Sequence, residues 1–284
     1  MTLLAVPNVS EGRDARQVAE IAEAFDGRLL DVHSDPDHNR SVLTLAGEPG
    51  ELASAVAAGA QKAVALVDLR RHQGIHPRVG ALDVAPVVYL EPENCGAACA
   101  EALVLGDRLG HQLGLPVFLY GELAGGRTRA ELRRGGPEAL ARRIQEAELA
   151  PDFGPSTLDP RKGAVLVAAR PPLIAFNLEL APPTTLSEAK AIAARIREGG
   201  NDALPGVRAL GLWLERTGRA QISTNIEDHR QTAPYQVIEA VARHAKIEAI
   251  ELVGLAPEAA LRDLPPEIPA RNLRSIEDAL RASA

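Results

Sequence analysis

The stretch from Arg70 to Asp83, RRHQGIHPRVGALD, gathers side chains that can do acid–base chemistry and bind anions. Gly74, Pro77 and Gly80 interrupt any helix or strand there, so we expect a shaped loop. Histidine can accept and donate a proton near neutral pH because its unperturbed pKa is about 6.5, and the arginine guanidinium matches a carboxylate. This stretch, the central loop, predicts chemistry on an anionic small molecule; a solvated surface loop is the plainer interpretation.

A metal site is a rival interpretation of the same residues. The segment from His33 to Arg40, HSDPDHNR, adds histidines and aspartates to His72 and His76 of the central loop, and these are metal-ligand types. However, no glutamate follows His72 as it does in a zincin helix, and the glycine and proline of the loop make a helical ligand pair implausible. We therefore expect no metal.

Composition limits the partners of the chain. The net charge is −7 and the isoelectric point is near 5.6, which argues against general nucleic-acid binding because that mode needs a basic surface. No run approaches the roughly 20 apolar residues that span a bilayer, and the N-terminus lacks the basic and apolar regions of a signal peptide. We expect a soluble, cytoplasmic protein with neither nucleic acid nor membrane as a partner.

Cys95 and Cys99 are four residues apart in an apparently helical stretch. That spacing puts both on one helix face, and a lone pair indicates a reducing compartment more than a disulfide framework. We interpret them as small core residues, with a metal or redox pair as the alternative.

Hydrophobic patterns predict the elements that must position these residues. The second half follows the order of a ferredoxin-like split βαβ motif, with strand 173–180, helix 186–198, strands 207–214 and 219–226, helix 234–246 and strand 249–254. The first half begins as βαββα, and the central loop and an extra strand at 85–90 come before its last helix and strand. We expect an α+β fold of two ferredoxin-like subdomains, residues 1–172 and 173–284, each a sheet with helices on one outer face.

Two segments of the first half fit no motif element. Residues 125–145 are rich in arginine, glycine and glutamate, and we expect an exposed excursion that ends in a helix. Residues 151–163, PDFGPSTLDPRKG, contain three prolines and two glycines, which predicts an ordered loop without regular structure.

Alternation along two strands of the second half predicts one apolar and one polar sheet face. The polar positions carry amides and a hydroxyl, and they are Asn177, Gln221, Ser223 and Asn225. If the two sheets face each other, these groups line a polar cleft and hydrogen-bond the substrate. Plain solvation of this face is the alternative.

Seven motifs, in order along both halves, give the chain a family resemblance. They are VPNVSEGRD at 6–14, LLDVHSDPDHNRSV at 29–42, RHQGIHPRVGALDV at 71–84, PVFLYGE at 116–122, PDFGP at 151–155, FNLEL at 176–180 and AQISTN at 220–225. The sequence resembles the formiminotransferase family, which comprises the glutamate formiminotransferases and the transferase half of the bifunctional formiminotransferase-cyclodeaminases. The cyclodeaminase half has no counterpart here, so the resemblance implies a stand-alone transferase.

The resemblance implies transfer of the formimino group of N-formimino-L-glutamate to N5 of tetrahydrofolate, a step of histidine degradation and one-carbon metabolism. Tetrahydrofolate is then a co-substrate, no metal is needed, and the protein is expected to be a homodimer. Two alternatives stay open: formyl transfer from N-formylglutamate to tetrahydrofolate, and a folate-binding protein without activity.

The resemblance also assigns site residues. The histidine of the HPR motif, the catalytic base in the family, is His76 here, and Arg78 is a candidate clamp for the glutamate carboxylate. In the charged turn after strand 29–33, Asp35, Asn39 and Arg40 are candidate substrate-binding residues. The folate-contacting loop maps onto ten residues: Gly154, Pro155, Ser156, Thr157, Leu158, Asp159, Pro160, Arg161, Lys162 and Gly163.

Overall fold

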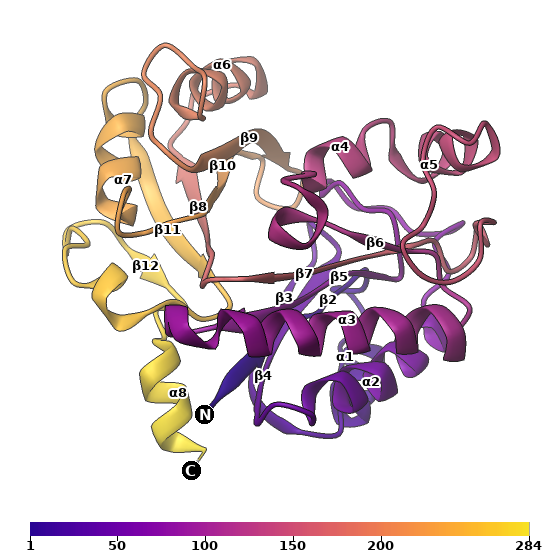
Figure 1. Ribbon diagram of the computed structural model, residues 1–284. Helices are drawn as coiled ribbons and strands as arrows, with labels where there is room; N and C mark the ends of the chain where they lie inside the picture. The colour runs from indigo at the N-terminus through magenta and orange to yellow at the C-terminus, as the bar shows by residue number, and fades with distance from the viewer. Residues whose placement is uncertain (284) are drawn as a thin grey trace. The chain divides into compact units, whose positions relative to one another are not determined.

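The computed structural model describes residues 1–283, and the chain divides into two compact units, Met1–Pro171 and Pro172 onward (Figure 1). Each unit has its own mixed sheet and its own buried apolar core. None of the helices within residues 1–283 is long and apolar enough to cross a membrane.

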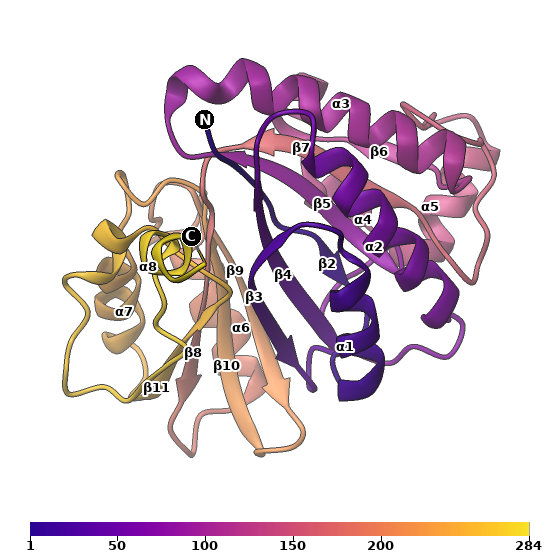
Figure 2. The same cartoon turned by 90° about the horizontal axis from the view of Figure 1, so that it is seen from below.

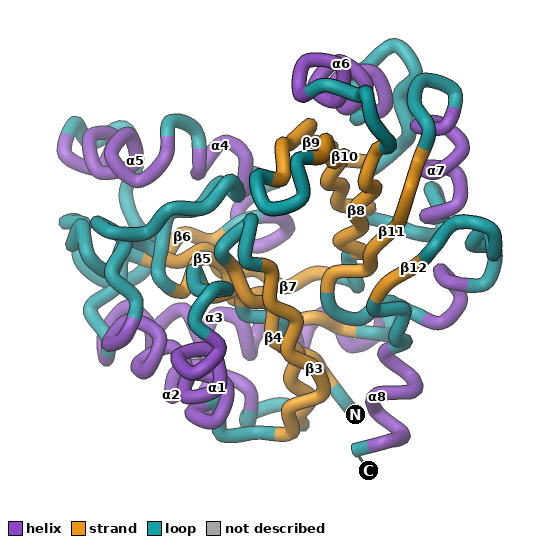
Figure 3. The backbone as a smooth tube through the Cα atoms, turned by 180° about the vertical axis from the view of Figure 1, so that it is seen from behind, coloured by secondary structure: helices purple, strands orange, loops and turns teal. Residues whose placement is uncertain are grey.

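The second unit is a ferredoxin-like sheet with helices on one face. Its elements are β8 (Ile174–Leu180), α6 (Leu186–Ile196), β9 (Val207–Leu214), β10 (Arg219–Ile226), α7 (Pro234–Ala242), β11 (Ile247–Val253), η3 (Glu258–Leu261), β12 (Ala270–Arg271) and α8 (Ile276–Ala282). The strand order is β12-β11-β8-β10-β9, and β12 adds a parallel edge strand to the four antiparallel strands of the motif (Figure 3). The predicted βαββαβ order of this half is confirmed.

Local sequence signals account for these elements. Phe176, Leu178 and Ile222 alternate along β8 and β10 and are fully buried in the core under α6 and α7, as period-two patterning requires. Helix α6 begins at a capping box in which the Thr185 side chain and Glu188 satisfy each other's backbone N–H groups. Pro234 starts α7 in the first turn, where its missing N–H costs no hydrogen bond.

The first unit contains the same motif with an extension. Its strands are β1 (Leu3–Ala5), β2 (Asn8–Val9), β3 (Arg28–Asp35), β4 (Arg40–Gly47), β5 (Leu82–Tyr89), β6 (Val117–Leu119) and β7 (Val165–Arg170). Its helices are α1 (Ala15–Ala24), α2 (Leu52–Leu66), η1 (Pro92–Asn94), α3 (Cys95–Gln112), η2 (Gly121–Ala124), α4 (Arg129–Arg133) and α5 (Gly136–Gln145). Strand β5 pairs antiparallel with β1 and β2, so it completes the motif and is not an interposed strand.

Strands β7 and β6 extend that sheet in parallel beyond β5. Helices α1, α2 and α3 cover one face, as Figure 2 shows, whereas α4 and α5 pack on the opposite face. Leu132 and Leu140 are completely buried there against Phe118 and Leu166. The expectation of an exposed excursion at 125–145 was therefore wrong in part: two buried leucines, eight residues apart, anchor one short helix each, and the helix expected at the end of the segment is present.

Helix α2 takes its N-terminal cap from another helix. The position before it, Glu51, makes no capping bond with its side chain. Glu101 of α3 supplies the acceptors instead, since its buried carboxylate accepts the N–H groups of Gly50 and Ala53, both at 2.6 Å. The negative charge also suits the positive end of the α2 dipole.

We expect Glu101→Ala to lower the free energy of unfolding by about 1–3 kcal/mol, because the buried N–H of Ala53 and the part-buried N–H of Gly50 lose their acceptor. Urea unfolding followed by circular dichroism measures the loss. Glu51→Ala is the matched control, since that side chain lies beside the same helix end without capping it. An equal loss in both variants would contradict the assignment of the cap to Glu101.

Candidate active site

The β3–β4 hairpin turn and the central loop are joined by side-chain and backbone hydrogen bonds. Asn39 donates from Nδ2 to the carbonyl of Gln73 at 2.9 Å, and Ile75 N–H donates to the carbonyl of Asp37 at 3.3 Å. Gly74 must be glycine for this approach, because a Cβ there would lie 2.4 Å from the carbonyl oxygen of His38. Two motifs 30 to 40 residues apart thus form one site.

His76 lies against the guanidinium of Arg40. Arg40 Nη1 is 2.9 Å from Nδ1 and 2.5 Å from Nε2 of the imidazole. Arginine can only donate, so the contacted ring nitrogen must hold a lone pair. Burial, followed by the charges of Arg40 and Arg133 and the nearby His38, holds the pKa of His76 well below its usual value. The imidazole is therefore neutral at physiological pH and can accept a proton.

His38 is the second ring of the site. It is buried, its ring centroid is 5.8 Å from that of His76, and its Nε2 lies 3.8 Å from Oδ2 of Asp35. Asp35 also accepts the backbone N–H groups of Asp37 and His38 at 2.8 and 2.9 Å, which shapes the turn. The structure thus places Asp35 at the base of the hairpin turn that carries Arg40.

His72 is held differently from His76. Its Nε2 hydrogen-bonds to the carbonyl oxygen of Asn39 at 2.9 Å, so this nitrogen is the donor. Burial lowers the pKa of His72 as well, although this hydrogen bond opposes the shift. A ring that is already committed to a backbone carbonyl serves to hold the loop.

Asn39 and Arg78 are also tied into the loop. Asn39 has a positive φ of 49°, which asparagine tolerates, and its Oδ1 accepts the N–H of Gly12 at 3.0 Å. Arg78 donates to the carbonyls of His72 at 2.7 Å and Gly74 at 3.3 Å. Within residues 1–283, the buried Nε of Arg78 has no partner. The remaining N–H groups of Arg78 can still bind an anion.

A buried ion pair that the sequence did not indicate lies beside these residues. Arg133 of α4 contacts Asp83 of β5, with side-chain exposures of 11% and 2%, and Asp83 also accepts the N–H of Val79 at 2.7 Å. Arg40 carries a second positive charge, and no carboxylate among residues 1–283 pairs with it. Burial and the neighbouring Arg133 charge lower the pKa of Arg40.

The two guanidinium groups and one carboxylate leave a net positive charge. Three buried polar groups here have no hydrogen-bond partner within the described chain. They are the Nε–H groups of Arg40 and Arg133 and the hydroxyl of Tyr120. Arg129 lies over the Tyr120 ring, 5.7 Å from its centroid, and adds positive charge nearby. Donors and charge of this kind fit an anionic ligand. The sequence did not point to Arg133, because its segment contains few apolar residues and was therefore expected to be exposed.

The loop Gly154–Gly163 is anchored at both ends. Phe153, just before it, packs on α3 where Gly106 and Gly110 leave room, since a Cβ on either would come within 2.9 Å of that residue. At its other end, the carbonyls of Arg161 and Lys162 accept the N–H groups of Leu69 and Ala81 at 3.0 and 2.8 Å. The ordered, irregular loop predicted for 151–163 is confirmed, and it joins both ends of the central loop.

The polar face of the second sheet is also as the alternation predicts. Asn177 pairs with Ser223 and Gln221 with Glu179 across the β8–β10 ladder, and Asn225 lies two residues further along β10. Asn177 donates to Glu251 at 3.4 Å, and Arg271 pairs with Glu179. This face therefore combines amides with charged groups of both signs.

These features define a class of protein: an α+β protein of two ferredoxin-like units, with a neutral histidine beside a buried guanidinium group that forms no ion pair within the described chain. Two family descriptions match the sequence, "Formiminotransferase domain, N-terminal subdomain" over residues 2–170 and "Formiminotransferase domain" over residues 175–264. The chain belongs to the formiminotransferase family, which confirms the resemblance seen in its motifs.

Relatives of known name agree with this assignment. A glutamate formimidoyltransferase of Thermoplasma acidophilum is 38% identical over 91% of this chain and 89% of its own length. A second glutamate formimidoyltransferase, from Streptococcus pyogenes, is 33% identical over 91% of this chain and 90% of its own length. A formimidoyltransferase-cyclodeaminase of Sus scrofa is 38% identical, and the matched region is 91% of this chain but 50% of that protein. The chain thus spans about half the length of the bifunctional relatives.

Proposed function

We propose that this chain transfers the formimino group of N-formimino-L-glutamate to N5 of tetrahydrofolate, giving 5-formiminotetrahydrofolate and glutamate. The observation that carries the proposal is the neutral His76 imidazole beside Arg40, which forms no ion pair with a carboxylate of the described chain. The names of the glutamate formimidoyltransferase relatives support the same reaction.

The reaction is an addition–elimination at the amidine carbon. N5 of tetrahydrofolate attacks the –CH=NH carbon, a tetrahedral intermediate forms, and the glutamate nitrogen leaves. One proton departs from N5 and one must reach the leaving nitrogen, and His76 can serve both steps as base and then acid. The guanidinium groups of Arg40 and Arg78 are proposed to bind carboxylates of the glutamate moiety. Asp35 and Asn39 are proposed to support the substrate from the hairpin turn.

Assay of the purified protein with tetrahydrofolate and either donor tests this proposal. We expect turnover with formiminoglutamate to exceed that with formylglutamate, which differs by oxygen in place of NH. The opposite preference would assign formyl transfer. Folate binding without turnover of either donor would identify a folate-binding protein without activity.

The pH dependence of kcat/KM should report the Arg40–His76 contact. The positive charge of Arg40 disfavours the imidazolium, so removing it raises the pKa of His76 towards its ordinary value. Because the protonated ring cannot act as a base, the acidic limb of the profile moves to higher pH in Arg40→Met. Arg40→Lys retains the charge and should keep the limb nearer to that of wild type. If the acidic limb of the profile lay at the same pH in Arg40→Met as in Arg40→Lys, the proposed coupling between Arg40 and His76 would be contradicted.

We further propose that folate binds along Gly154–Gly163. Lys162 is the residue of this loop best suited to a folate carboxylate, since its ammonium group makes no hydrogen bond or ion pair within residues 1–283. Arg161, in contrast, already donates to the carbonyl of Ala65 near the C-terminal end of α2, at 2.5 Å. The polar groups Asn177, Gln221, Ser223 and Asn225 of the second unit are proposed to hydrogen-bond substrate, and the protein is proposed to be a homodimer.

Lys162→Ala should weaken binding of folinate by about two- to fivefold, the usual size for one solvent-accessible charge pair. Arg161→Ala should mainly lower the melting temperature, because it removes a hydrogen bond at the end of α2. Titration calorimetry and thermal unfolding separate the two effects. Lys190→Ala, an exposed lysine on α6, is the charge control. Unchanged affinity in Lys162→Ala would remove the charge argument for this loop.

A further inference from the structure

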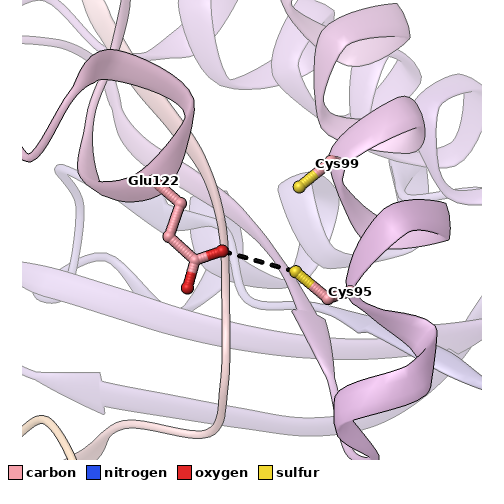
Figure 4. Close-up of side chains that lie close together, drawn as sticks. All are labelled: Cys95, Cys99 and Glu122. Carbon is pink, nitrogen blue, oxygen red and sulfur yellow. Dashed lines mark hydrogen bonds between the residues drawn. The ribbon is translucent and has the colours of Figure 1, made fainter.

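Two thiols and a carboxylate meet between α3 and η2, outside the site described above. Cys95 and Cys99, one turn apart on α3, and Glu122 of η2 each offer one ligand atom, and the three atoms lie within 4.8 Å of one another (Figure 4). Both cysteines are free thiols, and both are partly exposed. Positions i and i+4 share a helix face, and β6 carries the chain to Glu122 opposite that face.

The spacing of these atoms suits a small tetrahedral cation. Zinc–sulfur distances of about 2.3 Å and zinc–oxygen distances of about 2.1 Å put neighbouring sulfur and oxygen ligands about 3.6 Å apart. Cys95 Sγ lies 3.3 Å from Glu122 Oε2, a few tenths of an ångström below that separation, and Cys99 Sγ lies within 4.8 Å of both atoms. Tyr89 donates its hydroxyl to the other carboxylate oxygen at 3.4 Å, which is the kind of outer contact that orients a ligand.

We propose that Cys95, Cys99 and Glu122 bind one Zn²⁺ ion, with the fourth position open to water. Two thiolates select zinc over magnesium and calcium, which prefer all-oxygen sites. The bound ion would join the start of α3 to η2, immediately after Tyr120. This site is separate from the transferase chemistry and does not rest on it.

Both cysteines are also partly buried against the apolar core of the first unit, as expected for small core residues. Packing alone does not require a carboxylate partner, but Figure 4 shows both sulfur atoms directed towards the carboxylate of Glu122.

Titration of the reduced, metal-free full-length chain with Co²⁺ and then Zn²⁺ tests the site. We expect one Co²⁺ per chain with sulfur-to-cobalt charge-transfer absorption, which one equivalent of Zn²⁺ abolishes by displacement. Cobalt bound only at histidines would lack that absorption. Its absence in the wild-type chain would therefore overturn the proposal.

Variants assign the ligands. The double variant Cys95→Ser, Cys99→Ser should lose the charge-transfer absorption, and Glu122→Gln should keep it but bind Zn²⁺ at least about tenfold more weakly. Glu93→Gln is the control, an exposed carboxylate two residues before Cys95 that belongs to η1. Charge-transfer absorption that persists in the double variant, or wild-type affinity in Glu122→Gln, would place the ion elsewhere.

Discussion

Replacing His76 with alanine should lower kcat for formimino transfer by about 10²–10⁴-fold, the usual contribution of a general acid–base. The reason is that His76 is the neutral ring of the site, held beside Arg40 with its pKa well below the ordinary value. Folinate affinity should change little, because His76 is not part of the proposed folate loop, which is hydrogen-bonded at Leu69 and Ala81, on either side of His76 in the sequence. Steady-state kinetics and titration calorimetry measure the two quantities.

His72→Ala is the matched control, since it removes a second histidine of the same loop. Its Nε2 already donates to the carbonyl of Asn39, so this variant should lose stability more than turnover. A nearly inactive His72→Ala with a nearly normal His76→Ala would reverse the roles of the two rings. It would also remove the correspondence between the HPR motif of the family and His76.

Replacing Asp83 with alanine should lower the free energy of unfolding by about 3–5 kcal/mol, because it leaves a buried guanidinium without its counter-charge. Asp83 is the carboxylate that pairs with Arg133. It also accepts a hydrogen bond from the backbone N–H of Val79, near the end of the central loop where the chain enters β5. Denaturant unfolding gives the value. Asp68→Asn is the control, because its ion pair with Arg70 lies at the surface and should leave stability close to that of wild type.

A double variant separates the lost charge from the lost packing. In Asp83→Leu, Arg133→Met the guanidinium that lost its counter-charge is removed as well, so much of the stability lost in Asp83→Leu alone should return. Turnover should not return, since Arg133 helps to keep the His76 imidazole neutral. If the double variant were no more stable than Asp83→Leu, the ion pair would not be the cause of the loss.

Local patterns in the sequence determined most of the fold. Period-two alternation put Phe176, Leu178 and Ile222 in a core, and the Thr185–Glu188 capping box fixed the start of α6, because each depends only on residues near it in the chain. The same holds for the Asp14 cap of α1, where Oδ1 accepts the N–H groups of Arg16 and Gln17.

Pairing between distant strands was harder to infer. The sequence predicts a strand near residues 85–90, but only the sheet shows that β5 pairs with β1 and β2 and so completes the first motif. A strand's neighbours depend on which edges remain free after the whole chain has folded. For the same reason, β7 and β6 could be predicted as strands but not as a parallel extension.

By itself, the sequence determined the family, the βαββαβ order of the second unit and the two loops that carry His76 and Lys162, since motif order and hydrophobic period are properties of the chain. Only the tertiary structure decided what each ring and charge contacts. It separated His76, which faces Arg40, from His72, which is bound to a carbonyl, and it brought Arg133 to Asp83 across 50 residues. The physical reason is that a side chain's protonation and role depend on its burial and on charges within a few ångströms, and residues remote in the sequence supply these.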